Sequence, residues 1–376
     1  MSVASSRCTS CGAALPLVLA YPLCPCGGVP SLAAVCDPGP PSSTAGTTLW
    51  RYRAAFPFPD RLAPITLGES AVPLQSLALP GLRPGVFALR DDLLPTGSWK
   101  DRGSTFLIAA MLAHGYTDLI EDSSGNAALS LARYAQVARI SFTAFVPAAA
   151  TMVKKELIRE AGAALVEVPG PRSETTKAAQ RAAIEGRAWA AHALQPLHAA
   201  GAATAAFDIV ETLGRVPGAV VMPAGQGGYL AGVAAGFEAI SRTRGVPMPR
   251  MIGVQSMNCR PLVRAFDDKR EHSTAWTEPL GPSLAEGVQI IAPRRDREAI
   301  AAVRRSGGAL VAVTELALER AVRLAWREGL RIEPTAGLGL AFLLDANTRS
   351  LAGVEDVVVL LSGHGVRNGR ALIEGL

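Results

Sequence analysis

The chain has 376 residues, of which 49% are hydrophobic and 18% charged, and its formal net charge is +5. This length suggests roughly two to three domains, and the composition excludes wholesale disorder and allows a large buried core. The basic residues are scattered, mostly in pairs, and no basic run alternates with aromatic residues, so nucleic-acid binding gains little support. No apolar stretch approaches the length of a membrane span, and the short polar start does not resemble a signal peptide, so we expect a cytoplasmic protein.

Four of the six cysteines gather at the start of the chain, as a C-x-x-C pair, Cys8 and Cys11, and a C-x-C pair, Cys24 and Cys26. In a chain without a secretory signal, such a cluster indicates a metal site before a disulfide frame. Thiolates at these spacings can surround one tetrahedral Zn²⁺, and the glycines that follow let backbone N–H groups turn toward the sulfurs. We expect a structural zinc site, because four thiolates leave no open position. Free or partly oxidised thiols without a metal are the alternative.

Beyond a linker rich in Pro, Ser, Gly and Thr, short apolar runs alternate with amphipathic runs. The expected strands span 85–90, 140–146, 164–168, 219–223, 251–255 and 357–361. The expected helices span 104–113, 129–135, 154–161, 175–186 and 314–328, with a further helix beginning at 230. This alternation predicts an α/β fold with parallel sheets and right-handed crossovers.

The most informative stretch is Pro95-Thr96-Gly97-Ser98-Trp99-Lys100-Asp101-Arg102-Gly103, between an expected strand and an expected helix. The positive end of the helix and partial burial both disfavour the ammonium form of Lys100. A lysine amine in such a place is a nucleophile, and its usual use is a Schiff base with a carbonyl compound or with pyridoxal phosphate (PLP). The alternative is a surface lysine at the start of a helix, with Asp101 and Arg102 as ordinary charges of the first turn.

A second turn, Ser123-Ser124-Gly125-Asn126, joins a short strand to the expected helix 129–135. Its N–H groups, two hydroxyls and carboxamide suit a carboxylate or an aromatic hydroxyl oxygen. The alternative is a plain helix cap, because Ser and Asn are preferred capping residues.

A third turn, Gly225-Gln226-Gly227-Gly228, follows the expected strand 219–223 and opens a helix. Small residues there let backbone N–H groups close on a phosphate at the helix N-terminus. The spacing is neither the dinucleotide fingerprint nor a Walker loop, so a cofactor with a single phosphate fits better. A glycine turn without a ligand is the alternative.

The last expected strand, 357–361, delivers Ser362-Gly363-His364-Gly365 to its carboxyl end. Ligand groups gather at this end of parallel strands in open α/β sheets. Ser362 can therefore meet a ligand, whereas His364 could serve acid–base chemistry or only shape the turn between its glycines.

Together these four features describe what one cofactor needs. PLP requires an amine for its aldehyde carbon, an anion cradle for its phosphate, a hydrogen bond to its ring hydroxyl and a partner for its ring nitrogen. Lys100, the two turns and Ser362 supply one group for each need, so the sequence predicts a PLP enzyme.

These motifs resemble the fold-type II PLP enzymes of the tryptophan synthase β group, and most of all the threonine synthase branch. The matching stretches are Pro95 to Gly103, Ser123 to Ala128, Gly225 to Gly228, Glu333 to Ala336 and Ser362 to Gly365. The leading cysteine module also resembles the N-terminal extension of many threonine synthases. The resemblance covers nearly the whole chain.

The resemblance implies a role for each motif. Lys100 would bind PLP covalently and move protons, and Asn126 would hydrogen-bond the ring hydroxyl oxygen. Gly225, Gln226, Gly227 and Gly228 would cradle the phosphate, and Ser362 would face the ring nitrogen. Ser123, Ser124 and Gly125, with Asn126, would hold the carboxylate of a small amino-acid substrate.

The resemblance further implies two α/β domains with the cofactor between them, and a homodimer. The expected boundaries are a cysteine-rich module over 1–36, a linker over 37–49, a large PLP-binding domain over 50–103 and 187–376, and a small mobile domain over 104–186. We expect the small domain to close on the substrate.

The chain departs from the family pattern at Trp99, where Phe is usual, at Val72, where Thr is usual, and at two positions that carry cations in the threonine synthase branch. Where that branch carries an Arg and a Lys after its Asn-Pro, this chain has His198 and Ala203. Fixed cations are what a dianionic phosphate needs. Lys154, Lys155 or Arg159 could supply such a cation instead.

Three hypotheses follow. The first is a threonine synthase acting on O-phosphohomoserine. The second is a related enzyme performing β-elimination or β-replacement on another small amino acid, such as serine, threonine or a phosphorylated relative. The third is a zinc-ribbon binding protein whose α/β part has lost catalysis.

Overall fold

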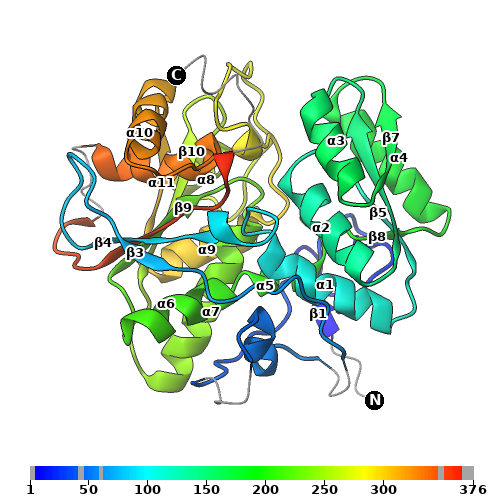
Figure 1. Cartoon of the computed structure of the whole chain (residues 1–376), viewed down its shortest axis with the longest axis horizontal. Helices are drawn as coiled ribbons and strands as arrows, with labels where there is room; N and C mark the ends of the chain where they lie inside the picture. The colour runs from blue at the N-terminus through cyan, green and yellow to red at the C-terminus, as the bar shows by residue number, and fades with distance from the viewer. Residues whose placement is uncertain (1–4, 41–45, 59–61, 346–350, 366–376) are drawn as a thin grey trace. The chain divides into compact units, whose positions relative to one another are not determined.

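A computed structural model describes residues 5–40, 46–58, 62–345 and 351–365 (Figure 1). The chain divides into two compact units: unit 1 comprises Met1–Ser70 and Lys100–Ala202, and unit 2 comprises Ala71–Trp99 and Ala203–Leu376. Unit 1 thus contains the cysteine-rich module as well as residues 104–186. The domain boundaries expected from the sequence stay a prediction, and residues 41–45 of the expected linker lie outside the described residues.

Unit 1 is built on a four-stranded parallel sheet in the order β7-β6-β5-β8. Its strands are β5 (Asp118–Glu121), β6 (Ser141–Pro147), β7 (Ala164–Val168) and β8 (Ala188–Trp189). Its helices are η1 (Leu49–Ala55), α1 (Asp101–Ala113), α2 (Asn126–Val137), α3 (Met152–Glu160), α4 (Arg172–Ile184) and α5 (Pro196–Gly201). The predicted strand 164–168 coincides with β7, and the predicted helices 104–113, 129–135, 154–161 and 175–186 are confirmed as α1 to α4 with shifted ends.

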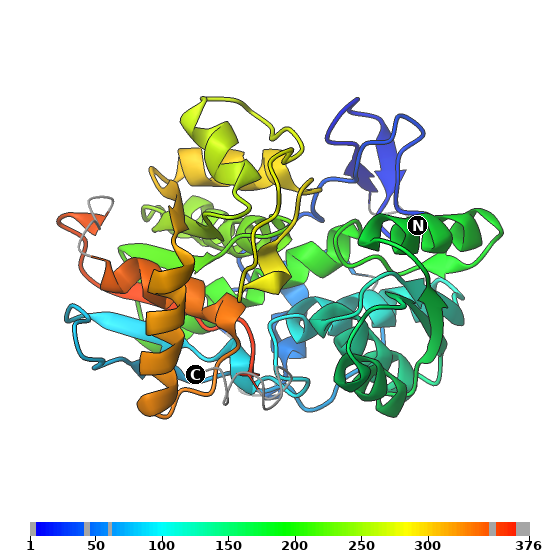
Figure 2. The ribbon, with the colours of Figure 1, turned by 90° about the horizontal axis from the view of Figure 1, so that it is seen from above.

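The cysteine-rich module begins with an antiparallel hairpin, β1 (Ser5–Arg7) and β2 (Ala14–Pro16). It then joins the sheet of unit 1 beside β8, where the Trp189 N–H donates to the Ala20 carbonyl at 2.7 Å. Tyr21 accepts a hydrogen bond from Gln180 of α4 at 2.6 Å, and Val29 belongs to the same buried cluster as Trp189. The module, blue in Figure 2, therefore shares a hydrophobic core with the sheet of unit 1 and lies beside α4.

Unit 2 is built on a six-stranded sheet in the order β11-β10-β9-β12-β4-β3, parallel except for the edge strand β3. Its strands are β3 (Leu74–Ser76), β4 (Val86–Leu89), β9 (Ala219–Pro223), β10 (Arg250–Ser256), β11 (Ala309–Val313) and β12 (Val357–Leu360). Its helices are η2 (Asp91–Leu93), α6 (Thr204–Leu213), α7 (Gly228–Arg244), α8 (Pro261–Asp267), η3 (Glu286–Val288), α9 (Asp296–Arg305), α10 (Glu315–Arg327) and α11 (Pro334–Leu344). Every residue of β9 and β12 is buried, as the continuous apolar runs of central parallel strands require.

Helix α11 lacks an amphipathic pattern because it is covered on both sides. A Cβ at Gly339 would lie 2.6 Å from Val359 of β12, and a Cβ at Gly337 would lie 2.5 Å from Val322 of α10. The helix is thus enclosed between the sheet and the amphipathic helix α10, which lies against it in Figure 1. A helix that is apolar all round belongs in a core.

Among the described residues, none of the helices combines the length and the apolar character that crossing a bilayer demands.

Candidate active site

Lys100 immediately precedes α1, and its carbonyl accepts the N–H groups of Gly103 and Ser104 at 3.1 and 2.9 Å. The charges beside it are deeply buried: Asp101 and Arg102 are both 0% exposed. The Asp101 carboxylate accepts a hydrogen bond from Ser130 of α2 at 2.6 Å. This burial argues against the alternative of a surface helix start and places Lys100, which is half-buried, at the edge of a packed core.

The segment before Lys100 is fixed in unit 2. The backbone N–H of Trp99 donates to the Ser362 carbonyl at 3.0 Å, and Ser98 pairs with Gly363 in an isolated β-bridge. The Trp99 ring stacks on Tyr229 with 4.3 Å between centroids. Lys100 is the next residue along the chain and the first of the second segment of unit 1.

The turn Ser123-Ser124-Gly125-Asn126 follows β5 and opens α2, as predicted. The cap residue of α2 is Gly125, which makes no side-chain cap hydrogen bond, so the alternative of a plain Ser or Asn cap is not the arrangement found. Instead, the Ser123 hydroxyl accepts the Gly125 N–H at 3.2 Å. Ser123, Ser124 and Asn126 are half-buried, and Gly125 is exposed, so the turn is accessible to a small ligand.

The turn Gly225-Gln226-Gly227-Gly228 lies between β9 and α7 in unit 2. Gly227 has a φ of +88°, and a Cβ there would lie 2.6 Å from the Arg295 carbonyl oxygen. Only glycine fits this conformation and this approach. The Gln226 carbonyl accepts the backbone N–H of Arg295 at 2.9 Å, and this hydrogen bond holds the turn.

Ser362 follows β12, the strand that pairs in parallel with β9, so it lies at the same sheet edge as the glycine turn. Its side chain is buried, and its Oγ has no hydrogen-bond partner among the described residues. A buried hydroxyl without a partner is costly unless a ligand supplies one. The His364 N–H donates to the Gly97 carbonyl at 2.9 Å, and His364 pairs with Ile332 in an isolated β-bridge, which fits a turn-shaping role.

Unit 1 contains a carboxylate–imidazole pair that sequence reasoning missed. Glu121 ends β5, and the carboxylate meets His192 twice, with 2.8 Å between Oε1 and Nδ1 and 3.2 Å between Oε2 and the His192 N–H. Burial and then repulsion from Asp122 raise the pKa of Glu121 well above its usual value. The hydrogen bond from the backbone N–H of His192 and the positive charges of Arg172 and Lys100 act in the opposite direction. Only the position of Glu121 at a strand end hinted at this pair, because the two residues are far apart in the sequence.

The two positions where the threonine synthase pattern carries a cation, His198 and Ala203, are both buried. His198 lies in α5 against Gly103 of α1, where a Cβ on the glycine would lie 2.2 Å from the His198 carbonyl oxygen. Its ring is 5.7 Å from the ring of His192. Ala203, the first residue of the second segment of unit 2, is 0% exposed. Neither position supplies a fixed cation.

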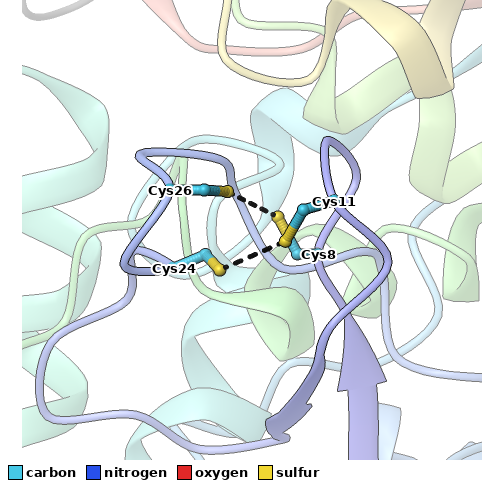
Figure 3. Close-up of side chains that lie close together, drawn as sticks. All are labelled: Cys8, Cys11, Cys24 and Cys26. Carbon is cyan, nitrogen blue, oxygen red and sulfur yellow. Dashed lines mark hydrogen bonds between the residues drawn. The ribbon is translucent and has the colours of Figure 1, made fainter.

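The four clustered cysteines converge as predicted (Figure 3). Their sulfurs lie within 4.8 Å of one another, with 3.5 Å between Cys8 and Cys26 and 3.7 Å between Cys11 and Cys24. Zinc–sulfur bonds of about 2.3 Å in a tetrahedron place neighbouring sulfurs about 3.8 Å apart, so the spacing fits. Burial raises the pKa of Cys8, but the N–H groups of Cys11 and Ser10 and the neighbouring thiols outweigh it and bring the pKa to about 6.

The predicted site residues thus fall into one group in each unit. Lys100 and Ser123 to Asn126 belong to unit 1, and Gly225 to Gly228 and Ser362 belong to unit 2. The turns 123–126 and 225–228 and Ser362 follow the carboxyl ends of parallel strands, where ligands gather in proteins with open α/β sheets. The sequence model of the pyridoxal-phosphate dependent enzyme family matches residues 65–363 of this chain. The chain therefore belongs to this family.

Similar proteins agree with this membership. The chain is 28% identical to the threonine synthase of Mycobacterium tuberculosis (strain ATCC 25618 / H37Rv) over 328 residues, 84% of this chain and 87% of that protein. It is 29% identical to the threonine synthase of Synechocystis sp. over 356 residues, 90% and 88% of the two chains.

Solved structures show the same fold. The crystal structure of threonine deaminase from T.th. has a TM-score of 0.67 at 28% identity, over 78% of this chain and 92% of that chain. Maize serine racemase has a TM-score of 0.68 at 18% identity, over 78% and 88% of the two chains, which shows the fold alone.

Proposed function

We propose that the protein is a PLP-dependent carbon–oxygen lyase that acts on a small amino acid, with PLP bound covalently at Lys100. The observation that carries the proposal is the buried Ser362 hydroxyl, which has no partner among the described residues and lies at the sheet edge beside the glycine turn. A pyridine nitrogen is the kind of acceptor that satisfies such a hydroxyl.

The other roles follow the same assignment. Gly225 to Gly228 present backbone N–H groups to the phosphate, and Asn126 meets the ring hydroxyl oxygen. Ser123, Ser124 and Gly125 bind the carboxylate of the substrate and orient its Cα–H bond toward Lys100, whose amine accepts the proton. When bound, PLP supplies an electron sink for the carbon that loses this proton.

Threonine synthesis from O-phosphohomoserine is the reaction that the curated relatives support, because they match over most of both chains. β-Elimination from an unphosphorylated hydroxy amino acid is the second candidate. It is favoured by His198 and Ala203, which leave no fixed cation where the threonine synthase pattern carries two.

A substrate panel separates these reactions. Purified enzyme with PLP is mixed with O-phosphohomoserine, L-serine or L-threonine, and the release of phosphate, ammonia and keto acid is measured. Release of phosphate with formation of threonine supports the first reaction, and release of ammonia with a keto acid from serine or threonine supports the second. A chain that takes up no PLP and turns over none of them is the non-enzyme of the third hypothesis.

We also propose that Cys8, Cys11, Cys24 and Cys26 hold one structural Zn²⁺. The fit rests on the sulfur spacing and on Gly28, where a Cβ would lie 2.5 Å from the Cys8 sulfur, so the ligand loop needs a glycine there. A zinc ion would stabilise the module that shares a core with β8.

Chelation tests the zinc site. Elemental analysis is expected to find one zinc per chain, and its removal to lower Tm by about 5–10 °C, as a loss of about 2–3 kcal/mol does in a domain of this size. Cys24→Ser is expected to abolish zinc binding, whereas Cys36→Ser, at an exposed cysteine outside the cluster, is expected to retain it. Equal zinc content in both variants would contradict the site.

A cytoplasmic location, a homodimer and closure of residues 104–186 on the substrate stay predictions.

A further inference from the structure

We propose that Glu121 and His192 form an acid–base pair that protonates a departing hydroxyl group, with His192 as the catalytic residue and Glu121 as the residue that positions it. This inference rests on the proposed PLP-dependent elimination and names its substrate class: unphosphorylated β-hydroxy amino acids.

The pair lies beside the proposed substrate turn. β5 and β8 are parallel neighbours, with Leu119 opposite Ala188 and Ile120 opposite Trp189. Glu121 and His192 follow these paired residues and emerge at the same carboxyl edge. Ser123, the first residue of the proposed carboxylate-binding turn, comes two positions after Glu121. A group at this edge is therefore near the Cβ of an amino acid whose carboxylate lies on the turn.

The contacts of the pair give its members different tasks. The Glu121 side chain is 0% exposed and that of His192 is 15% exposed. Glu121 binds both the backbone N–H and the Nδ1 of His192, so it fixes the imidazole orientation. The ring geometry then directs Nε2 away from Glu121. A buried carboxylate that orients an imidazole through Nδ1 is the arrangement that makes Nε2 a proton donor or acceptor.

Burial, helped by the charge of Asp122 and opposed by the charges of Arg172 and Lys100, favours a transferable proton on the pair. Three groups act on Glu121: Asp122 from the same loop, Arg172 from the start of α4, and Lys100 from the start of α1. Arg172 also forms an ion pair with Asp122 at 3.0 Å. The negative charge of Asp122 partly cancels the effect of Arg172 on Glu121. His198 faces His192 from α5. Burial favours the net neutral state of the pair, in which one proton more is bound than in the anionic state.

A hydroxyl leaving group needs this proton, whereas a phosphate does not. In the proposed step, the Cβ–O bond breaks and both of its electrons go to oxygen, which takes the proton from His192 Nε2 and departs as water. The electrons of the Cα–H bond form the Cα–Cβ double bond, and the proton passes to the Lys100 amine. Water then hydrolyses the dehydrated amino acid to ammonia and a keto acid. Lys100 releases its proton to solvent, and the pair regains one from solvent.

The test varies the leaving group. Elimination from L-serine or L-threonine is compared with elimination from β-chloro-L-alanine, because chloride departs without protonation. Glu121→Gln and His192→Asn are expected to lower kcat/KM for the hydroxy amino acids by about 100-fold, at the low end of general acid catalysis. Both are expected to retain elimination of chloride. Glu174→Gln, the same change at a half-buried position of α4 whose side chain is 39% exposed, is the matched control and is expected to retain both activities.

The pH profile gives a second readout. An acid acts only when protonated, so wild-type turnover of serine or threonine is expected to fall as the pH rises through the pKa of the pair. Turnover of β-chloro-L-alanine is expected to lack this fall. In His192→Asn the fall is expected to be absent for both substrates.

Each outcome decides the inference. An equal loss of kcat/KM on hydroxy amino acids and on β-chloro-L-alanine, in both variants, would mean that the pair only stabilises the fold. That result would overturn the proposal. Wild-type enzyme that carries PLP but turns over only O-phosphohomoserine would overturn the substrate class while leaving the proposed PLP chemistry intact. Failure to take up PLP would instead overturn the proposed function itself. If Glu121→Gln does not fold, His192→Asn decides the comparison.

Discussion

Lys100→Ala is expected to abolish turnover, with a loss on the order of 10³-fold or more, because the covalent attachment of PLP and the proton transfer proposed for Lys100 disappear together. Alanine removes the amine together with the methylene chain that carries it and adds no bulk at the cap of α1. The variant is expected to show no visible absorbance band from bound PLP. It is also expected to keep no cofactor after reduction with borohydride and denaturation, whereas the wild type retains it at Lys100, as peptide mass spectrometry can show.

Lys177→Ala is the matched control. Lys177 lies on α4 in an exposed ion pair with Glu174, and the substitution is identical. Exposed pairs of this kind contribute about 0–1 kcal/mol, so this variant is expected to retain the absorbance band and the activity. A Lys100→Ala protein that still traps PLP covalently would show that another lysine binds it.

Gly227→Ala is expected to have the second-largest effect. A residue with a side chain held at the positive φ of this position costs about 1–3 kcal/mol, and the overlap of its Cβ with the Arg295 carbonyl costs about 1–3 kcal/mol more. A combined cost of about 4 kcal/mol equals roughly 10³-fold in an equilibrium constant. Because the turn must shift to relieve the overlap, the N–H groups proposed for the phosphate shift with it. We expect the loss mainly in PLP affinity, measured by titration of the apoenzyme.

Gly245→Ala is the control for Gly227→Ala, because it introduces backbone strain without an overlap of the added Cβ with a neighbouring atom. Gly245 ends the same helix with a φ of +66°, and a Cβ there meets no atom within 4 Å. This variant is expected to lose about 1 kcal/mol of stability and to keep its PLP affinity. Equal PLP affinity in the two variants would contradict the assignment of the phosphate to the turn at Gly227.

Much of the local structure could be predicted from the sequence. The strands 164–168 and 219–223 coincide with β7 and β9, and both predicted ligand turns lie between a strand and a helix. These features depend on the spacing of apolar residues and on glycines at turns, which are local properties of a chain. Membership of the PLP-dependent enzyme family could be recognised for the same reason, since its motifs are short and contiguous.

Other features could not be predicted because their cause lies elsewhere in the chain. Helix α11 has no amphipathic pattern, since the sheet covers one side and α10 the other. The attachment of the cysteine-rich module depends on Ala20 meeting Trp189, two residues with no recognisable relation in the sequence.

By itself, the sequence determined the α/β fold class, the positions of the two turns proposed to bind ligands and the grouping of the four cysteines. Only the tertiary structure decided that the Ser362 hydroxyl is buried without a hydrogen-bond partner among the described residues. It also decided that Oε1 of Glu121 lies 2.8 Å from Nδ1 of His192. The physical reason is that burial and proton affinity depend on the neighbours that surround a group in space. Parallel strands bring such neighbours to one edge from distant parts of the chain, and no local pattern records which of them will meet.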